Sequence, residues 1–303
     1  MSLAREVLLG PFAFLSVSKL GAALMFVIIL AFTATTQIGG VLLWVMLPAL
    51  RRLHRVLRPS GAWLAWPASV IGFALAYLAV TLFVVPPLAS QFGRVALPCY
   101  AEQARPYGAA SAIFCLANRH YAVPEVHGLL DGLSRHLADH FPGSEVSYLD
   151  ASFPFFDGFP LPPHLSHHDG RKIDLAFFYE SKADGRSRPK GAAWPIGYWA
   201  FTGPEPDEAQ PCADFHDWRS LRWDFDWLQP RFADSVLDQE RTRAMLAWLV
   251  GEGASLGVEK VLLEPHLRNR LGATSALIRF QGCRAARHDD HIHVQLRKPA
   301  PRG

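Results

Sequence analysis

The chain has 303 residues, of which 50% are hydrophobic and 19% are charged, and its formal net charge is +3. We find no basic patch interleaved with aromatic residues, so the sequence excludes an obvious nucleic-acid partner. It also contains no internal repeat and no low-complexity tract.

The first ninety residues differ in composition from the rest. No charged residue occurs between Lys19 and Arg51, or between Arg58 and Arg94. Each gap holds an apolar stretch longer than the roughly 20 residues that cross a bilayer. We therefore predict two transmembrane helices, at about residues 24–47 and 63–85, within a membrane anchor of residues 1–89. A cleavable signal peptide is the alternative for the first stretch, but the run is long and a second one follows.

Orientation follows from the loop between the two predicted helices. Arg51, Arg52, Arg55 and Arg58 are concentrated there. Short loops rich in arginine and lysine stay in the cytoplasm. We therefore expect both termini, and all of residues 90–303, on the opposite side of the membrane.

Cysteine usage agrees with an exported domain. All four cysteines lie after the predicted anchor, at positions Cys99, Cys115, Cys212 and Cys283. An even number of cysteines in an oxidising compartment indicates disulfides, and four cysteines allow three pairings. We favour Cys99–Cys115 together with Cys212–Cys283.

Residues 90–303 predict an α+β domain, with an antiparallel sheet and flanking helices, because strands and helices follow one another without βαβ regularity. Apolar residues at helical spacing predict helices over 124–141 and 238–249, with a short one at 265–271. The predicted strands are residues 145–149, 172–179, 194–201, 258–263 and 276–280.

Two short histidine clusters carry the chemical information. The first contains His167 and Asp174, and the second contains His288, His291 and His293. Two imidazoles and one carboxylate, with a further imidazole beside them, match the three protein ligands and open position of a catalytic zinc site. A structural zinc would have four ligands and would favour cysteine.

Strand parity separates the roles of these residues. Ile173, Leu175 and Phe177 share one face of the predicted strand, so Asp174 points to the other. His291 and His293 are two residues apart and project from the same side of their strand. A regular strand turns Asp290 away from His293. A β-bulge in the strand would reverse this orientation of Asp290.

Some nearby residues receive a simpler interpretation. We interpret His164 and His168 as loop residues rather than ligands, with His168 as a substitute ligand if the register differs. We interpret Arg119 as a member of a surface ion pair, with binding of a substrate carboxylate as the alternative. Three further tryptophans are interpreted as core aromatics, with a glycan-binding groove as the alternative: Trp218, Trp223 and Trp227.

The two clusters resemble the signature of the zinc peptidases related to lysostaphin and to D-alanyl-D-alanine metallopeptidases. That signature is His-x6-Asp followed far downstream by His-x-His. The chain is most similar to the penicillin-insensitive murein endopeptidases, in His167-x2-Gly170-x3-Asp174, in His288-x2-His291-x-His293 and in the segment 258–265. The resemblance extends over about residues 144–297.

The resemblance implies zinc ligands at His167, Asp174 and His293. It places His291 beside the metal-bound water as the catalyst, with His288 as a further candidate for that role or for support of the site. Asp290 is the alternative base, because related dipeptidases place an acid three residues before the last ligand. We prefer His291, since a regular strand turns Asp290 away from His293, although a bulge would reverse that choice. We therefore expect a membrane-anchored zinc peptidase of the bacterial inner membrane, which cleaves peptidoglycan stem peptides or cross-links in the periplasm. The alternative is a non-catalytic zinc-bearing module that binds peptidoglycan or a protein. The bond cleaved, the protein partners and the oligomeric state are not predicted.

Overall fold

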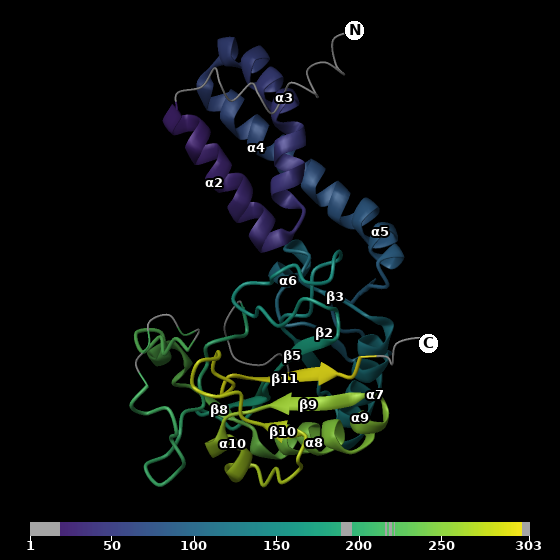
Figure 1. Cartoon of the computed structure of the whole chain (residues 1–303), viewed down its shortest axis with the longest axis vertical. Helices are drawn as coiled ribbons and strands as arrows, with labels where there is room; N and C mark the ends of the chain where they lie inside the picture. The colour runs from purple at the N-terminus through teal and green to yellow at the C-terminus, as the bar shows by residue number, and fades with distance from the viewer. Residues whose placement is uncertain (1–18, 189–195, 216, 218–219, 221, 299–303) are drawn as a thin grey trace. The chain divides into compact units, whose positions relative to one another are not determined.

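The computed structural model describes residues 19–188, 196–215, 217, 220 and 222–298, and the chain falls into two units. The first unit extends to Gln91 and includes the short segment Leu116–Asn118. The second unit comprises Phe92–Cys115 and the chain from Arg119 onward. Both units are drawn in Figure 1, and each is described by itself.

The first unit is helical. Its described elements are α2 (Lys19–Thr36), α3 (Gly39–Leu57), η2 (Arg58–Ser60), α4 (Ala62–Ala79), the π-helical turn η3 (Val80–Val84) and α5 (Val85–Gln91). Helix α3 packs against both α2 and α4. Elements α4, η3 and α5 form one continuous helix over Ala62–Gln91.

The structure divides the first predicted transmembrane span in two. Gln37 has a φ of 65° and interrupts the apolar run between α2 and α3. Gly40 then lies against α2, where a Cβ atom would collide with the carbonyl oxygen of Ile29. The prediction of one continuous helix over residues 24–47 is therefore wrong, because the chain folds back at Gln37 as a close-packed helical pair.

The second predicted span lies within a long apolar helix. Among the described residues, the helix Ala62–Gln91 alone is long and apolar enough to cross a membrane, by length and composition. The apolar helix Leu20–Thr36 is shorter. The chain thus carries one candidate membrane span in its described part.

The second unit is built on a mixed sheet with the order β10-β9-β11-β5-β4-β2. The strands are β2 (Tyr107–Ala109), β4 (Val146–Tyr148), β5 (Lys172–Ala176), β9 (Val258–Leu262), β10 (Ile278–Arg279) and β11 (His291–Leu296). The central pairs are antiparallel, as predicted, but β9 pairs with β10 in parallel, and so does β2 with β4. The expectation of a purely antiparallel sheet is therefore wrong at both edges.

The helices of the second unit pack on this sheet, most of them on one face, while Phe114 packs with Ala176 of β5 in a separate cluster. They are α6 (Ala112–Leu116), α7 (Pro124–His140), α8 (Gln239–Val250), α9 (Glu252–Ser255) and α10 (Pro265–Arg270), with the 3-10 turn η4 (Gln229–Phe232). The amphipathic helix α7 contacts α8, β2 and β4, and α8 contacts β9. Ile173 and Leu175 of β5 are completely buried in the resulting core. The helices predicted near residues 124–141, 238–249 and 265–271 are confirmed.

Two smaller sheets complete the unit. One pairs β1 (Val95–Ala96) with β3 (Tyr121–Ala122). The other has the order β7 (Ser187–Arg188), β6 (Tyr179–Ser181), β8 (Ser235–Leu237). The strand predicted at 194–201 is wrong for its described part, because residues 196–201 form a loop. The remainder of that prediction lies outside the described residues.

Both predicted disulfides are present in the second unit. Cys99 pairs with Cys115, and Cys212 pairs with Cys283. The second bond ties the loop that precedes η4 to the segment just before His288.

Candidate metal centre

The sheet brings the two histidine clusters together through the pairing of β5 with β11. Asp174 lies directly opposite His293, while Ile173 and Leu175 lie opposite Val294 and Ile292. Because side chains alternate along a strand, the apolar residues enter the helix-covered core and the polar ones share the other face. His291 follows the same parity as His293.

The three predicted zinc ligands converge on one point. Asp174 Oδ1 lies 2.9 Å from His293 Nδ1 and 3.2 Å from His167 Nε2. The two imidazole nitrogens are 3.0 Å apart. All three residues are buried. Ligands about 2.1 Å from a tetrahedral zinc ion are roughly 3.3 Å from one another, so the observed spacing needs to expand by only a few tenths of an ångström.

The loop before β5 fixes the orientation of His167. Its Nδ1–H donates a hydrogen bond of 2.7 Å to the carbonyl oxygen of Ala151, which leaves the Nε2 lone pair directed at Asp174 and His293. Ser152 Oγ donates to the His167 carbonyl and accepts from the Gly170 amide. Gly170 has a φ of 72°, which lets the loop turn into β5.

The donor set fits a divalent cation of the zinc type. Two imidazole nitrogens and a carboxylate oxygen face one another at this point. Without a metal ion, a single proton on His293 Nδ1 would have two acceptors, His167 Nε2 and Asp174 Oδ1. A cation at their common point would accept a lone pair from each of the three atoms. His288, the first histidine of the second cluster, lies near this point, with its ring centroid 5.8 Å from that of His293.

A second group of donors surrounds the other oxygen of Asp174. Asp174 Oδ2 lies 3.2 Å from His164 Nδ1 and 3.7 Å from His291 Nε2. The Tyr198 hydroxyl donates a hydrogen bond of 2.7 Å to the same oxygen. His164, Asp174 and His291 form a second set of three residues with donor atoms close enough for a metal ion. His164 lies in a loop, as predicted, and its Nδ1 atom is close enough to the other two donors to join them.

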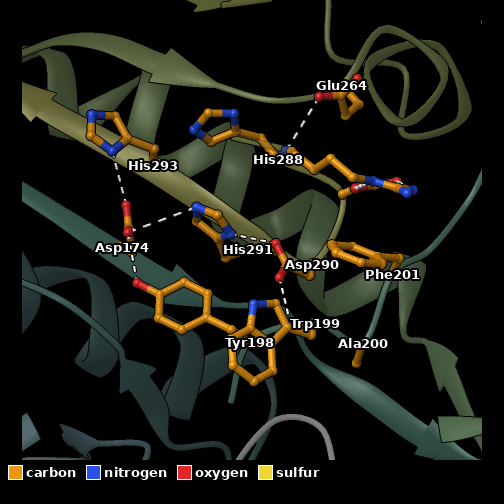
Figure 2. A network of polar contacts seen from close by, with 12 residues as sticks. Asp174, Tyr198, Trp199, Ala200, Phe201, Glu264, His288, Asp290, His291 and His293 are labelled. Atoms are coloured by element: carbon orange, nitrogen blue, oxygen red, sulfur yellow. Dashed lines mark hydrogen bonds and ion pairs between the residues drawn. The ribbon is translucent and has the colours of Figure 1, made fainter. Parts of the chain in front are cut away.

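His291 is held by Asp290 (Figure 2). The Nδ1–H of His291 donates to Asp290 Oδ1, and Asp290 Oδ2 accepts a hydrogen bond of 2.6 Å from the Trp199 amide. The Nε2 atom of His291 is buried and has no hydrogen-bond partner among the described residues. The imidazole thus has a fixed orientation and one free nitrogen, which faces Asp174.

His288 lies beside these groups without hydrogen-bonding to them in the described contacts. Its ring centroid is 5.0 Å from that of His291. Its backbone amide donates a hydrogen bond of 3.2 Å to Glu264 Oε1. Glu264 in turn accepts two hydrogen bonds of 2.9 Å from the Arg222 guanidinium, one at each carboxylate oxygen. His288 therefore packs against the candidate catalyst and its own position is anchored through the backbone.

Arg119 forms a bidentate salt bridge with Asp150. Its guanidinium binds both carboxylate oxygens, with Nε 2.5 Å from Oδ1 and Nη2 2.8 Å from Oδ2. Asp150 Oδ2 also lies 3.0 Å from His164 Nδ1 and 3.2 Å from the Tyr198 hydroxyl. The Asp150 side chain is 2% exposed, so the predicted surface ion pair is instead a buried one that supports the site.

Burial and neighbouring charges both shift the pKa values of the site residues. Burial raises the pKa of Asp174, but the imidazoles of His167, His291 and His164 outweigh it and hold the pKa well below its usual range. Burial lowers the pKa of His293 to about 4. Burial also lowers the pKa of His291, but Asp290 and Asp174 more than offset this and raise it to about 9. Burial, with Asp150 and Asp174, raises the pKa of Tyr198 well above its usual value, which keeps its hydroxyl a hydrogen-bond donor.

A small open cleft of about 30 Å³ reaches the second group of donors. His164, Tyr198, Asp290 and His291 line its polar part. Its remaining walls are largely aromatic and include Trp199, Phe201, Trp223 and Phe225. Trp223 therefore lines a groove instead of the core, and Trp227 is 75% exposed, whereas Trp218 lies outside the described residues.

A comparison with models of protein families gives no match to this chain, and a comparison with curated proteins gives none either. The case for the site therefore depends on the residues themselves. Sequence reasoning missed His164, Tyr198 and Asp150. His164 had a detectable signal, since it stands three residues before His167 in a His-x2-His pair. Tyr198 and Asp150 had none, because they reach the site through tertiary folding.

Proposed function

We propose that this protein is a membrane-anchored, zinc-dependent peptidase that hydrolyses peptide bonds in peptidoglycan stem peptides or cross-links. The observation that carries the proposal is the convergence of His167, Asp174 and His293 with a buried, unpartnered His291 Nε2 beside them. Three protein ligands with a neighbouring imidazole are the arrangement of a hydrolytic zinc site.

The chemistry divides between the ion and the side chains. A bound zinc ion acidifies a coordinated water toward neutral pH and polarises a carbonyl group. A cation beside Asp174 would oppose the carboxylates that raise the pKa of His291 and would favour its neutral form. Neutral His291 would take a proton at Nε2 and return it to the leaving amine, while its Nδ1–H donates to Asp290. Both oxygens of Asp290 are engaged, one by His291 and the other by the Trp199 amide. Asp290 is therefore a positioning residue, which supports the choice of His291 over Asp290.

The substrate class comes from the resemblance of the two histidine motifs to peptidoglycan endopeptidases. The cleft adds a compatible surface, since the exposed ring of Trp223 and the ring of Phe225 lie at its wall, 5.8 Å apart. Such rings contact the apolar faces of an extended peptide or of a sugar.

We infer that the protein resides in a bacterial inner membrane with its second unit in the periplasm. The helix Ala62–Gln91 is long enough to cross the bilayer. Arg51, Arg52 and Arg55 of α3, with Arg58, lie on the N-terminal side of this helix and favour the cytoplasm for that end. Two disulfides in the second unit favour an oxidising compartment for the other end.

One observation favours the second candidate function, a non-catalytic zinc-bearing module that binds peptidoglycan or a protein. The cleft is lined by His164 and His291, whereas His167 and His293 do not line it. A zinc ion held deeply among buried ligands would stabilise the fold without meeting a substrate.

Digestion of purified muropeptides by the zinc-loaded, full-length protein in detergent separates the two functions. We expect new peptide termini by mass spectrometry from the wild-type protein. His291→Ala should retain its tightly bound zinc but lose at least about 100-fold in rate, the usual contribution of a general acid–base group. His140→Ala, at an exposed position in the last turn of α7, is the matched control. Peptide binding without cleavage by the wild-type protein would favour the module.

A further inference from the structure

We propose that the site holds a second divalent cation, bound by His164 Nδ1, His291 Nε2 and Asp174 Oδ2. The inference depends on the proposed zinc site, because Asp174 would bridge the two ions through its two oxygens. The second ion binds more weakly than the first and inhibits hydrolysis.

The two oxygens of Asp174 face two separate sets of imidazoles. Oδ1 lies near His167 and His293, whereas Oδ2 lies near His164 and His291. A carboxylate with imidazole donors on both of its oxygens is suited to bridge two metal ions about 3.5–4 Å apart. Asp174 is completely buried on β5 opposite His293, so both of its oxygens are enclosed by these donors and not by solvent.

His291 already has the surroundings of a metal ligand. A ligating histidine usually donates its second ring N–H to a carboxylate or a carbonyl, which fixes the orientation of the ligating nitrogen. His167 does this with Ala151, and His291 does it with Asp290. The remaining Nε2 atom of His291 is buried, has no hydrogen-bond partner in the described part of the chain and is directed at Asp174 (Figure 2).

His164 supplies the third donor in an electronegative environment. Its Nδ1 atom lies 3.0 Å from Asp150 Oδ2 and 3.2 Å from Asp174 Oδ2. Two carboxylates and two imidazoles thus surround one point, and the nearest guanidinium, Arg119, is bound to Asp150 on its other side. The cleft reaches His164 and His291, which provides an entry path from solvent to the second site.

The expected consequence is inhibition by excess metal. An ion bound to His291 Nε2 occupies the lone pair that proton transfer requires. Repulsion between two divalent ions a few ångströms apart, together with a shared carboxylate, makes the second ion bind at least about tenfold more weakly. Activity of the wild-type protein should therefore rise and then fall as zinc is added. Activity that stays constant while the second ion binds would overturn the inhibitory role.

Equilibrium dialysis against zinc, with the metal content of the full-length protein measured in detergent, tests the second site directly. We expect about two zinc ions per wild-type chain at high zinc, and about one in His164→Ala and in His291→Ala. His140→Ala corrects for zinc bound at the protein surface. Two variants are used because a folding defect in one would leave the other informative, and thermal unfolding identifies such a defect.

The outcomes separate this inference from the proposed function. A wild-type protein that binds one zinc ion overturns the second site and leaves the peptidase proposal intact. A wild-type protein that binds none overturns both. Two ions in the wild-type protein and also in both variants would place the second ion elsewhere and overturn the assignment of its ligands.

Discussion

The hydroxyl of Tyr198 lies 2.7 Å from Oδ2 of Asp174 and donates a hydrogen bond to it. Hydrogen bonds to a ligating carboxylate fix its orientation, and loss of one typically lowers metal affinity by about 10–100-fold. We therefore predict that Tyr198→Phe binds zinc about 10–100-fold more weakly, as measured by competition with a chromophoric chelator. Tyr100→Phe, at a position that is 71% exposed, should leave the affinity unchanged. Equal affinities in Tyr198→Phe and the wild-type protein would show that this hydrogen bond does not position Asp174.

The buried pair of Arg119 and Asp150 should matter more for stability than an exposed pair on α7. Removal of one partner leaves a buried charge without compensation and costs about 3–5 kcal/mol. We expect Arg119→Met to lower the free energy of unfolding by that amount. The comparison is Arg135→Ala, which breaks an ion pair with Asp131 in which the arginine is 63% exposed. Its expected cost is about 0.5 kcal/mol or less. Urea titrations of the two variants measure both values, and similar costs would contradict the burial argument.

The two disulfides should contribute unequally. The Cys212–Cys283 bond closes a separation of 71 residues, whereas the Cys99–Cys115 bond closes 16. The loss of chain entropy in the unfolded state gives about 4 kcal/mol for the longer loop and about 3 kcal/mol for the shorter one. Calorimetry of the two double serine variants should show the larger decrease in Tm for Cys212→Ser with Cys283→Ser. The opposite order would mean that strain or residual structure outweighs loop length.

The pair of Glu208 with Arg270 predicts a stability difference that depends on pH. Hydrogen bonds from Arg270 lower the pKa of Glu208 from 4.5 to about 2. A carboxyl group with a depressed folded-state pKa stabilises the protein above its unfolded pKa and loses that contribution as the pH falls through the folded value. Wild-type protein should therefore be more stable than Glu208→Gln at pH 6, by about 1 kcal/mol or less because the pair is partly exposed. The difference should shrink at about pH 3 and vanish near pH 2. A difference that is constant between pH 6 and pH 3 would exclude the ionised pair as its cause.

Much of the site was predictable because it lies on two strands with regular alternation. The alternation of side chains along β5 and β11 places Asp174, His291 and His293 on one face. The pairing register then sets Asp174 directly opposite His293. The helices near α7 and α8 were predictable for the same kind of reason, since their apolar residues repeat at helical spacing. The interruption at Gln37 had a signal as well, a polar residue followed by Gly39 and Gly40 within an apolar run.

Other features were not encoded locally. Parallel and antiparallel edge strands have similar apolar patterns when both are buried, so the directions of β2 and β10 could not be read from the sequence. The segment around Tyr198 has the composition of a strand, but Gly197 and Trp199 both adopt positive φ and form a loop. That loop presents Tyr198 and the Trp199 amide to the site. Neither contact leaves a pattern in neighbouring residues.

The most direct test of the account is anomalous X-ray scattering at the zinc edge from crystals of the protein grown with zinc. The account predicts a zinc peak about 2.1 Å from His167 Nε2, Asp174 Oδ1 and His293 Nδ1. Well-ordered side chains at these three positions with no anomalous peak between them would contradict it.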